Sequence, residues 1–231
     1  MKTGMLTEYH CHILPGIDDG SDSVETSLKM VQTMHEQGVR RIVTTSHFYS
    51  HREESVDAFL KKRSAAFRAL MEGGPAITDI RLGAEIAIEH GVSEMPGLHK
   101  LAIEGTDLIL MEFPYRRFEE WMEEEIDNVI AKYDFRVIVA HVHRYLDYYT
   151  KDQMENLVNL NAILQVNNEA FENRKEKKLV KRLIENDYPL VFGSDAHNMK
   201  TRKPNWNLVQ KKVDPRVLTR SNRLLDRHLT E

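Results

Sequence analysis

Short apolar runs recur along the chain, and most of them are followed by a segment with helical periodicity. The first helical segment is the clearest. Apolar residues recur from Val24 to Met34 at the spacing of one helical face, and Gly38 ends the pattern. Asp22 and Glu25 have the spacing of a capping box. This segment therefore predicts an amphipathic helix placed directly before a strand.

The same alternation continues to the end of the chain. After a first strand that ends at His10 and His12, strands are predicted at residues 40–47, 79–86, 106–113, 135–142, 162–168 and 189–197. Further helices are predicted at residues 63–72, 116–133, 151–160 and 175–187, with a closing helix at 214–229. Several strands are apolar on both faces, as buried parallel strands are. The pattern predicts an α/β fold, either a barrel or an open doubly wound sheet. Without a linker or a repeat, residues 1–231 are interpreted as a single domain.

Composition narrows the class of protein. A length of 231 residues with 41% hydrophobic and 29% charged residues is ordinary for a globular chain, and a net charge of −4 argues against a nucleic-acid partner. One cysteine allows no internal disulfide and fits a reducing compartment. The N-terminus lacks the apolar core of a signal peptide, and no apolar run approaches the roughly 18 residues of a membrane span. We therefore expect a cytoplasmic protein without membrane insertion.

Histidines and carboxylates stand at the ends of six predicted strands. These strand-end residues are His10, His12, His47, Glu85, Glu112, His141, Asp195 and His197. In a parallel α/β fold the carboxyl ends of the strands open on one face, where active sites collect. Imidazole and carboxylate are ligands of zinc, manganese and iron. The pattern favours a metal site on this face, with Asp18 and Asp19 in the first loop as further candidates.

Each of these residues also has an ordinary structural interpretation. A lone H-x-H usually makes common hydrogen bonds, adjacent aspartates between glycines usually form a turn, and a glutamate at a strand end usually pairs with an arginine. The coincidence of so many ligand types at strand ends favours the metal site. Cys11 lies between His10 and His12, but Ile17 stands where a cysteine phosphatase would need an arginine. Cys11 is therefore predicted to be structural.

The motifs together resemble those of the polymerase and histidinol phosphatase (PHP) superfamily. The resemblance rests on H-x-H after the first strand, TTSH, GAE, MEFP, AH and a terminal SDAH, and it runs from His10 to about Pro204. Within the superfamily, HCHILPGIDDGS, AHVHRY and GSDAHN are similar to the bacterial metal-dependent protein tyrosine phosphatases of capsule and exopolysaccharide synthesis. The resemblance implies a distorted (β/α)7 TIM-like barrel with three divalent metal ions, most often Mn²⁺, with iron or zinc as alternatives.

The resemblance also implies a role for each matching position. The first metal would be held by His10, His12, Glu85 and Asp195, the second by Glu85, Glu112 and His141, and the third by Asp19, His47 and His197. Arg144 and Arg202 match the phosphate-binding arginines. His143 departs from the pattern, and the segment PYRRFEEW after Glu112 cannot be mapped onto it.

These expectations define a function and two alternatives. The expected reaction is hydrolysis of a phosphomonoester by a metal-bridged hydroxide, with Asp195 or His197 assisting the leaving group. The expected substrate is a tyrosine-phosphorylated protein, such as the tail of a bacterial tyrosine kinase. A histidinol-phosphate phosphatase would use the same ligands on a small alkyl phosphate. A metal-stabilised binding module without turnover is the alternative from another class, and it would not need Arg144 or Arg202.

Overall fold

The structure is a computed structural model that describes residues 5–226. Within these residues, short parallel strands form two sheets. One sheet contains β1 (Leu6–Glu8), β2 (Val39–Thr44) and β4 (Ile80–Leu82), in that order. The other contains β3 (His47–Phe48), β5 (Glu85–Ala87), β6 (Leu108–Glu112), β7 (Arg136–Val139), β8 (Ile163–Asn167) and β9 (Leu190–Gly193). Every paired neighbour in both sheets is parallel, as the strand–helix alternation predicts.

Two predicted strands are each divided into two. The prediction of one strand at 40–47 is wrong, because the ladder breaks between β2 and β3, and the strand predicted at 79–86 breaks between β4 and β5. Two backbone hydrogen bonds cross the breaks, from Gly83 N to Thr44 O (2.9 Å) and from Glu85 N to Ser46 O (3.0 Å). The segments 39–48 and 80–87 therefore stay side by side through the break. Each segment still occupies one position in the order of strands.

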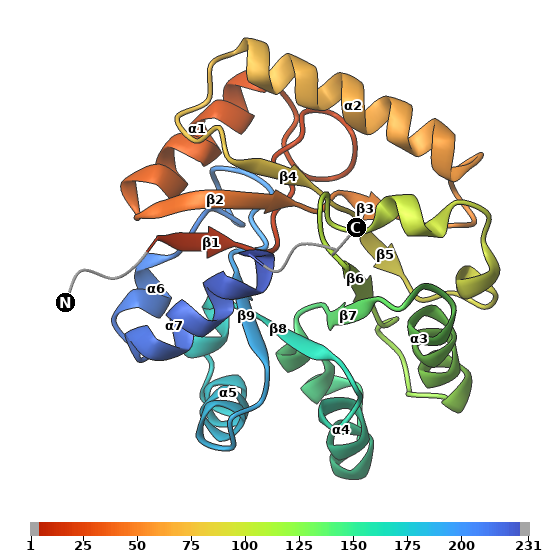
Figure 1. The fold of residues 1–231 in the computed structure, drawn as a ribbon. Helices are drawn as coiled ribbons and strands as arrows, with labels where there is room; N and C mark the ends of the chain where they lie inside the picture. Colours follow the sequence, from red (N-terminus) through yellow and green to blue (C-terminus); the bar gives the residue numbers. More distant parts are fainter. Residues whose placement is uncertain (1–4, 227–231) are drawn as a thin grey trace.

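The first and last strands are joined by backbone hydrogen bonds. Tyr9 N donates to Phe192 O (3.2 Å), Asp195 N to His10 O (2.7 Å) and His12 N to Ala196 O (2.9 Å). The strands therefore follow one another around a ring in chain order, and Figure 1 shows the helices outside it. This arrangement is the distorted TIM-like α/β barrel expected from the sequence.

The helices cover the outside of the ring. They are α1 (Val24–Glu36), α2 (Val56–Glu72), α3 (Glu120–Tyr133), α4 (Lys151–Val158), α5 (Arg174–Glu185), α6 (Asn207–Gln210) and α7 (Pro215–Asn222). Short 3₁₀ turns lie at η1 (Val92–Glu94), η2 (Leu98–Leu101), η3 (Val142–Asp147), η4 (Asn168–Phe171) and η5 (Arg223–Asp226). No helix among residues 5–226 has the length and hydropathy needed to cross a bilayer.

The start of α1 differs from the prediction by one residue. Ser23, not Asp22, is the N-cap, and its hydroxyl accepts a hydrogen bond from Thr26 N at 3.2 Å. Asp22 instead accepts hydrogen bonds from the hydroxyls of Ser23 and Thr26. A serine at the N-cap satisfies the same free N–H groups as an aspartate, so spacing alone cannot separate the two.

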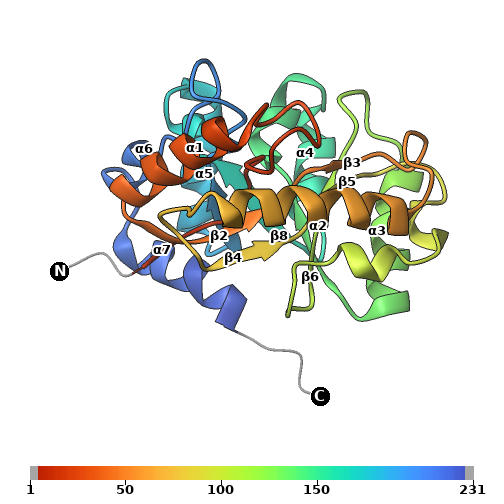
Figure 2. The ribbon, with the colours of Figure 1, turned by 90° about the horizontal axis from the view of Figure 1, so that it is seen from above.

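The C-terminal segment packs against β1 and β9. Asn222 Oδ1 accepts from Thr7 N (2.9 Å), and Ser221 O accepts from the hydroxyl of Tyr9 (2.7 Å). Leu225 is fully buried in the apolar cluster that also contains Tyr9. The helix predicted at 214–229 is thus the shorter α7 followed by the turn η5, and residues 227–229 lie outside the described residues. Figure 2 shows α7 on the lower side of the molecule and the red loop after β1 on the upper side.

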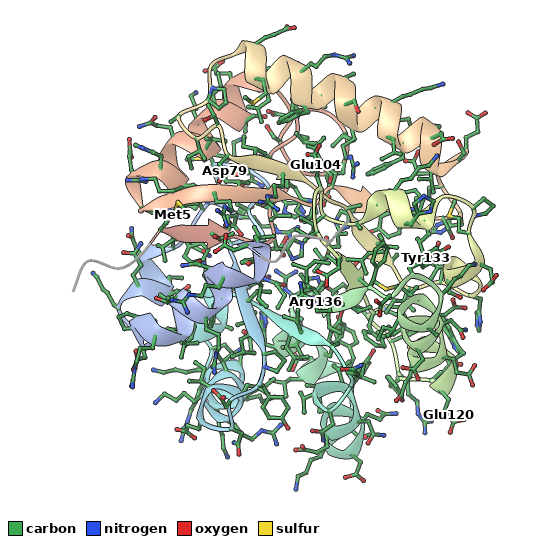
Figure 3. All side chains as sticks on the ribbon, in the orientation of Figure 1. Met5, Asp79, Glu104, Glu120, Tyr133 and Arg136 are labelled. Carbon is green, nitrogen blue, oxygen red and sulfur yellow. The ribbon has the colours of Figure 1, made fainter. Side chains whose placement is uncertain are left out.

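The core has two layers. A large cluster lies mainly between the strands and the helices, and a smaller one contains Val43, Leu108, Leu110, Ile138 and Val191. Figure 3 shows side chains filling the space enclosed by the strands. On β6 the positions that alternate with Leu108 and Leu110 belong to the outer cluster, as a pleated strand requires.

Gly193 is required by the close approach of β9 to β1. A Cβ atom at this position would lie 2.8 Å from Glu8 Oε1, from His10 Cβ and from the backbone nitrogen of His10. Gly193→Ala is therefore expected to lower the free energy of unfolding by about 1–3 kcal/mol, measured by urea unfolding, because backbone must move. The control is Ser194→Ala, which changes the neighbouring residue without adding an atom against β1, and it should lower the free energy of unfolding by less than Gly193→Ala does. Equal stability of Gly193→Ala and wild type would contradict this account of the closure.

Candidate metal centre

The predicted ligands gather at the carboxyl ends of the strands. Their side chains come from the loops after β1, β7 and β9, from the first residues of β3 and β5, and from the last residue of β6. Their ligand atoms form overlapping groups, in each of which the atoms lie within 4.8 Å of one another. The groups are His12, Asp19, His47 and His197; His10, His12 and Asp195; His10, Glu85 and His141; and His47, Glu85 and Glu112.

Glu85 lies at the centre of the cluster and is only 1% exposed. Its Oε2 atom lies 3.1 Å from His10 Nε2 and 3.2 Å from His12 Nε2. Its Oε1 atom lies 2.9 Å from His141 Nε2. The two oxygen atoms thus face different histidines, which is the placement that a carboxylate bridging two cations needs.

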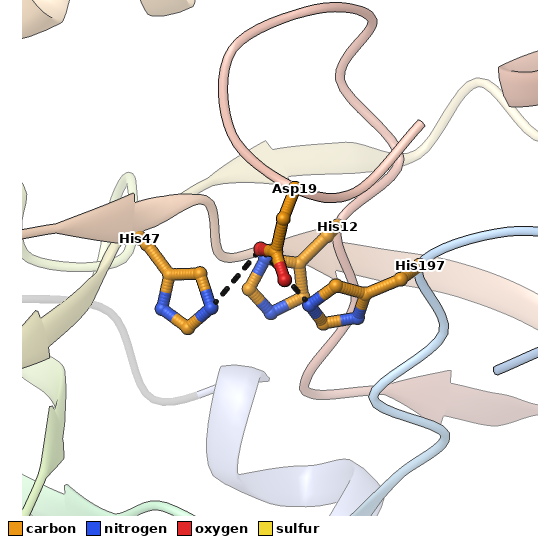
Figure 4. A group of neighbouring side chains, drawn as sticks. All are labelled: His12, Asp19, His47 and His197. Atoms are coloured by element: carbon orange, nitrogen blue, oxygen red, sulfur yellow. Dashed lines mark ion pairs between the residues drawn. The ribbon is translucent and has the colours of Figure 1, made fainter. Parts of the chain in front are cut away.

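Asp19 closes the cluster from the loop after β1. Its Oδ1 atom lies 3.4 Å from His47 Nε2 and 3.4 Å from His197 Nε2, and Figure 4 shows its carboxylate between these two rings, with His12 beside them. The side chain of Asp19 is 65% exposed, so this part of the site opens to solvent.

Asp18 has a different role from its neighbour. Its Oδ2 atom accepts hydrogen bonds from His12 Nδ1 (2.8 Å) and from His47 N (2.9 Å), and its Oδ1 atom accepts from Gly20 N (3.0 Å). These bonds orient the His12 ring so that Nε2 faces the cluster. A Cβ at Gly20 would lie 2.4 Å from His12 Cβ, so this tight loop requires glycine.

The carboxylates of Glu85 and Asp195 are held in the ionised state. Burial alone would raise the pKa of Glu85, but His10, His12 and His141 hold it well below its usual range. Burial acts in the same direction on the pKa of Asp195, which His10, His12 and Arg144 hold well below its usual range. His141 responds in the opposite sense: burial lowers its pKa, but Glu112 and Glu85 raise it to about 9. The cluster therefore needs positive charge, which protons or metal ions can supply.

Three buried atoms at the centre make no hydrogen bond within the described part of the chain. They are Glu85 Oε2, Asp195 Oδ1 and His197 Nε2. The other ring nitrogen of His197 bonds to the carbonyl oxygen of Asp195 at 2.9 Å, which aims Nε2 at the cluster. Unsatisfied buried polar atoms are costly, and metal ions bound by nitrogen and oxygen ligands would satisfy all three. The residues present therefore fit a centre of divalent cations.

Asp195 connects this cluster to the two predicted phosphate-binding arginines. Its Oδ2 atom lies 2.8 Å from Arg144 Nη1 and accepts a hydrogen bond from Arg202 Nη2 at 2.7 Å. Its other oxygen atom lies 3.4 Å from His12 Nε2. Arg144 also donates to Glu169 Oε1 at 3.0 Å. The two guanidinium groups thus meet on the side of Asp195 that faces away from the histidines.

Strand β8 provides supporting residues that the motif search did not identify. Gln165 Oε1 bonds to His10 Nδ1 (3.1 Å) and accepts from His141 N (2.6 Å). Gln165 Nε2 donates to Asn167 Oδ1, and Asn167 Nδ2 donates to Asp195 Oδ2. Both amides are fully buried and alternate with apolar residues along β8. This alternation is the sequence signal that could have identified them.

Two of the candidate ligands have unusual backbone conformations. His141 has a φ of 30° and Asp195 a φ of 49°, in the left-handed region that non-glycine residues rarely adopt. Strained residues of this kind cluster at functional sites. His143, the residue that departs from the family pattern, is 1% exposed but belongs to none of the ligand groups.

The fold and the site together define a class of protein: a parallel α/β barrel with a histidine–carboxylate cluster, able to bind metal ions, at the carboxyl ends of its strands. The model of the family described as capsular polysaccharide synthesis, CpsB/CapC, matches residues 6–224. The chain belongs to this family.

Individual relatives agree with the family match. The chain is 25% identical over 209 residues to the tyrosine-protein phosphatase CpsB of Streptococcus agalactiae serotype III (strain NEM316), with 86% of each chain covered. It is 25% identical over 202 residues to the tyrosine-protein phosphatase YwqE of Bacillus subtilis (strain 168), covering 85% of this chain and 79% of the relative.

A solved structure supports the fold. It is one of the crystal structures of YwqE from Bacillus subtilis and CpsB from Streptococcus pneumoniae, which are described as unique metal-dependent tyrosine phosphatases. The two structures superpose with a TM-score of 0.79 at 24% identity, covering 97% of this chain and 96% of the other. A TatD-like protein from Archaeoglobus fulgidus shares the fold more distantly, with a TM-score of 0.52 and 11% identity.

Replacing Glu85 tests the bridging position. Glu85→Ala is expected to lower the number of metal ions bound per chain, because Glu85 belongs to two of the ligand groups. The measurement is elemental analysis of protein reconstituted with Mn²⁺ and freed of excess metal. The control is Glu89→Ala, which removes a nearby carboxylate that accepts from Ser50 and His51 and belongs to none of the groups. Unchanged metal content in Glu85→Ala would leave Glu85 a structural carboxylate.

Proposed function

We propose that this chain is a metal-dependent protein tyrosine phosphatase. The observation that carries the proposal is the meeting of Arg144 and Arg202 at Asp195, at the edge of the ligand cluster. Guanidinium groups beside a metal centre form a binding site for an oxyanion. A purely structural metal site does not need them. The names of the relatives supply the substrate class, since they are tyrosine-protein phosphatases.

We assign three divalent ions to the centre, with Mn²⁺ as the preferred metal. The proposed ligands are His10, His12, Glu85 and Asp195 for the first ion, Glu85, Glu112 and His141 for the second, and Asp19, His47 and His197 for the third. The group of His12, Asp19, His47 and His197 contains the third set, and the group of His10, His12 and Asp195 contains three members of the first. The second set falls in two groups that share Glu85, and His141 Nε2 lies 3.3 Å from Glu112 Oε1. Bound divalent ions would supply Lewis acidity and a water of lowered pKa.

The residues of the chain carry out the remaining tasks. Arg144 and Arg202 bind the phosphoryl oxygens. Their side chains are 30% and 36% exposed, so a substrate can reach them. A bound phosphate dianion takes the place of Asp195 as the partner of the two arginines. As the ester bond breaks, negative charge develops on the leaving oxygen. Phenolate is a fair leaving group, with a phenol pKa of about 10, so the reaction needs little acid assistance, and the ionised Asp195 is not its source.

The openness of the site favours phosphotyrosine over histidinol phosphate. The side chain of Asp19 is 65% exposed, and Tyr115, 41% exposed, lies with its hydroxyl 3.3 Å from His141 Nε2. An open site with an aromatic rim suits a tyrosine side chain that projects from a protein. The proposed substrate is a tyrosine-phosphorylated protein of capsule or exopolysaccharide synthesis, such as the tail of a tyrosine kinase, in the cytoplasm.

A cysteine-based mechanism does not fit this site. Cys11 is fully buried, and its Sγ lies 3.5 Å from Val43 O in the outer core. Burial raises the pKa of the Cys11 thiol well above its usual range, with Glu8 and Asp195 acting in the same direction. A thiolate nucleophile needs the opposite shift.

Metal dependence is the direct test of the proposed function. Protein reconstituted with Mn²⁺ is expected to hydrolyse a phosphotyrosine peptide faster than histidinol phosphate, and excess chelator should abolish this activity until Mn²⁺ is restored. Cys11→Ser should retain activity, because the thiol is away from the ligand cluster. Phosphate release is measured for both substrates on one preparation. Full activity in excess chelator would falsify the assignment, and preference for histidinol phosphate would select the alternative enzyme.

The arginines separate an enzyme from a metal-stabilised binding module. Arg144→Ala or Arg202→Ala is expected to lower kcat/KM by about 10²-fold or more, because a preorganised donor is lost, while the metal content stays unchanged. Lysine at either position should rescue only part of the loss, since a point charge cannot reproduce the guanidinium fork. Arg216→Ala is the control, because Arg216 pairs with Asp214 on the exposed side of α7. Turnover near the wild-type value in both alanine variants would contradict the phosphate-binding role.

A further inference from the structure

A groove outside the metal centre runs between helices α4 and α5. It has a volume of about 1000 Å³ and is separate from the cavity of about 710 Å³ that Arg144 and Arg202 line. Figure 1 shows α4 and α5 side by side on the outside of the ring. The proposed phosphatase chemistry does not use any residue of this groove.

The walls of the groove are strongly basic. Seven lysine or arginine side chains line it against two glutamates, although the whole chain has a net charge of −4. Helix α5 supplies most of them: Arg174, Lys175, Lys177, Lys178, Lys181 and Arg182. Positions 174, 178, 181 and 185 are three or four residues apart, so they share one face of the helix.

Few of these cations are neutralised within the protein. Arg182 pairs with Glu155 across the groove, and Lys175 lies 3.9 Å from Asp147. Lys178 and Lys181 are exposed, and in the described part of the chain neither has a carboxylate within ion-pair distance. The groove therefore has an excess of positive charge available to a ligand.

The floor of the groove is apolar but contains one unsatisfied polar atom. Tyr149, Met154 and Leu179 line it and are at most 7% exposed. The hydroxyl of Tyr149 is buried and makes no hydrogen bond with any described residue. This hydroxyl is closed to solvent, so the floor offers a ligand an apolar surface. The floor thus suits a ligand that is partly apolar, and the walls suit one that is acidic.

The groove begins beside the metal centre. Leu146 at its end lies two residues after Arg144, in the same turn η3. Tyr149 stacks on Tyr145 with ring centres 5.2 Å apart, and the Tyr145 ring lies 5.9 Å from that of His141. Helix α5, with 12 residues, spans about 18 Å, the length of roughly five or six residues of extended chain.

We propose that the α4–α5 groove docks an acidic segment of the phosphorylated substrate protein, five or six residues long and containing apolar side chains. The inference rests on the proposed function, since it assigns the groove to the same substrate that the metal centre dephosphorylates. The segment lies outside the phosphotyrosine itself, and its carboxylates pair with Lys178 and Lys181 while its apolar side chains cover Met154 and Leu179. Docking of this kind raises affinity for the correct protein without changing the chemical step.

The depth of the groove favours a peptide over an anionic membrane as its ligand. A bilayer surface is flat and cannot reach the floor of the groove, whereas an extended segment can contact both walls and the floor. Nucleic acid would also pair with the lysines, but its readers combine the positive charge with exposed aromatic platforms, and Tyr149 is 7% exposed.

The test compares two phosphotyrosine peptides that share one core. The second peptide carries, through a glycine–serine linker, a segment of alternating glutamate and leucine. With the Mn²⁺-reconstituted protein, KM is expected to be about tenfold lower for the extended peptide, with kcat unchanged, and the advantage should shrink as salt rises. Lys178→Glu/Lys181→Glu should remove the advantage and leave hydrolysis of the core peptide at the wild-type rate.

Controls keep the outcome specific to the groove. Lys61→Glu/Arg68→Glu makes the same change of charge on the exposed side of α2, on the other side of the ring from α5, and should keep the advantage of the extended peptide. If the charge-reversed α5 variant unfolds, Lys178→Gln/Lys181→Gln replaces it. Fluorescence anisotropy of the labelled glutamate–leucine segment, without phosphotyrosine, measures docking even where no peptide is hydrolysed.

The two proposals can therefore fail separately. Absence of hydrolysis of the core peptide contradicts the phosphatase, whatever the anisotropy shows. Normal hydrolysis of the core peptide, with no gain from the acidic segment and no anisotropy signal, overturns the groove. Tighter binding of phosphatidylserine vesicles or of an RNA oligonucleotide than of the acidic segment, lost in the same α5 variant, also overturns it.

Discussion

Backbone hydrogen bonds between the ends of the first and last strands hold the site together. Through the bonds from Asp195 N to His10 O and from His12 N to Ala196 O, residues at opposite ends of the chain become neighbours. Glu8 strengthens this junction, because its buried carboxyl group accepts from Ser194 N and from Trp206 Nε1, and burial raises the pKa of Glu8 to about 7. The ligands after β1 and β9 therefore share one cluster only when the ring is closed.

Closing the ring places negative charge in a poorly solvated interior, and this charge constrains everything around it. Glu85, Glu112 and Asp195 are each at most 8% exposed, and burial of ionised groups is unfavourable unless positive charge compensates it. His141 meets this need in part by taking up a proton, as its raised pKa indicates. Divalent ions meet it more completely, and they also satisfy atoms that no hydrogen bond reaches. The stability of the site and its capacity to bind metals thus have one electrostatic origin.

Local patterns in the sequence were sufficient for the parallel α/β fold and for the residues that gather at the strand ends, because both depend on periodicity and on distance from a strand. The break between β2 and β3 was missed because it depends on how a strand pairs with its neighbours, not on its own residues. The N-cap of α1 was misplaced because Asp22 and Ser23 compete for the same N–H groups. Gln165 and Asn167 went unnoticed because amides are ordinary hydrogen-bonding residues, and only their alternation with buried apolar residues along β8 marks them.

Asp195 shows why such a site suits a phosphoryl group. Its Oδ1 atom faces the histidines, while Oδ2 faces Asn167, Arg144 and Arg202. The Asp195 carboxylate group alone thus separates the histidines of the ligand cluster from the two guanidinium groups. A phosphoryl group carries several oxygen atoms at a comparable spacing, so it can contact both sides at once and still have an oxygen atom left for the ester bond. The left-handed backbone of Asp195, with a φ of 49°, turns the side chain into this position at a cost in strain. The hydrogen bonds that Oδ2 accepts from Asn167 and Arg202 hold the carboxylate in this position.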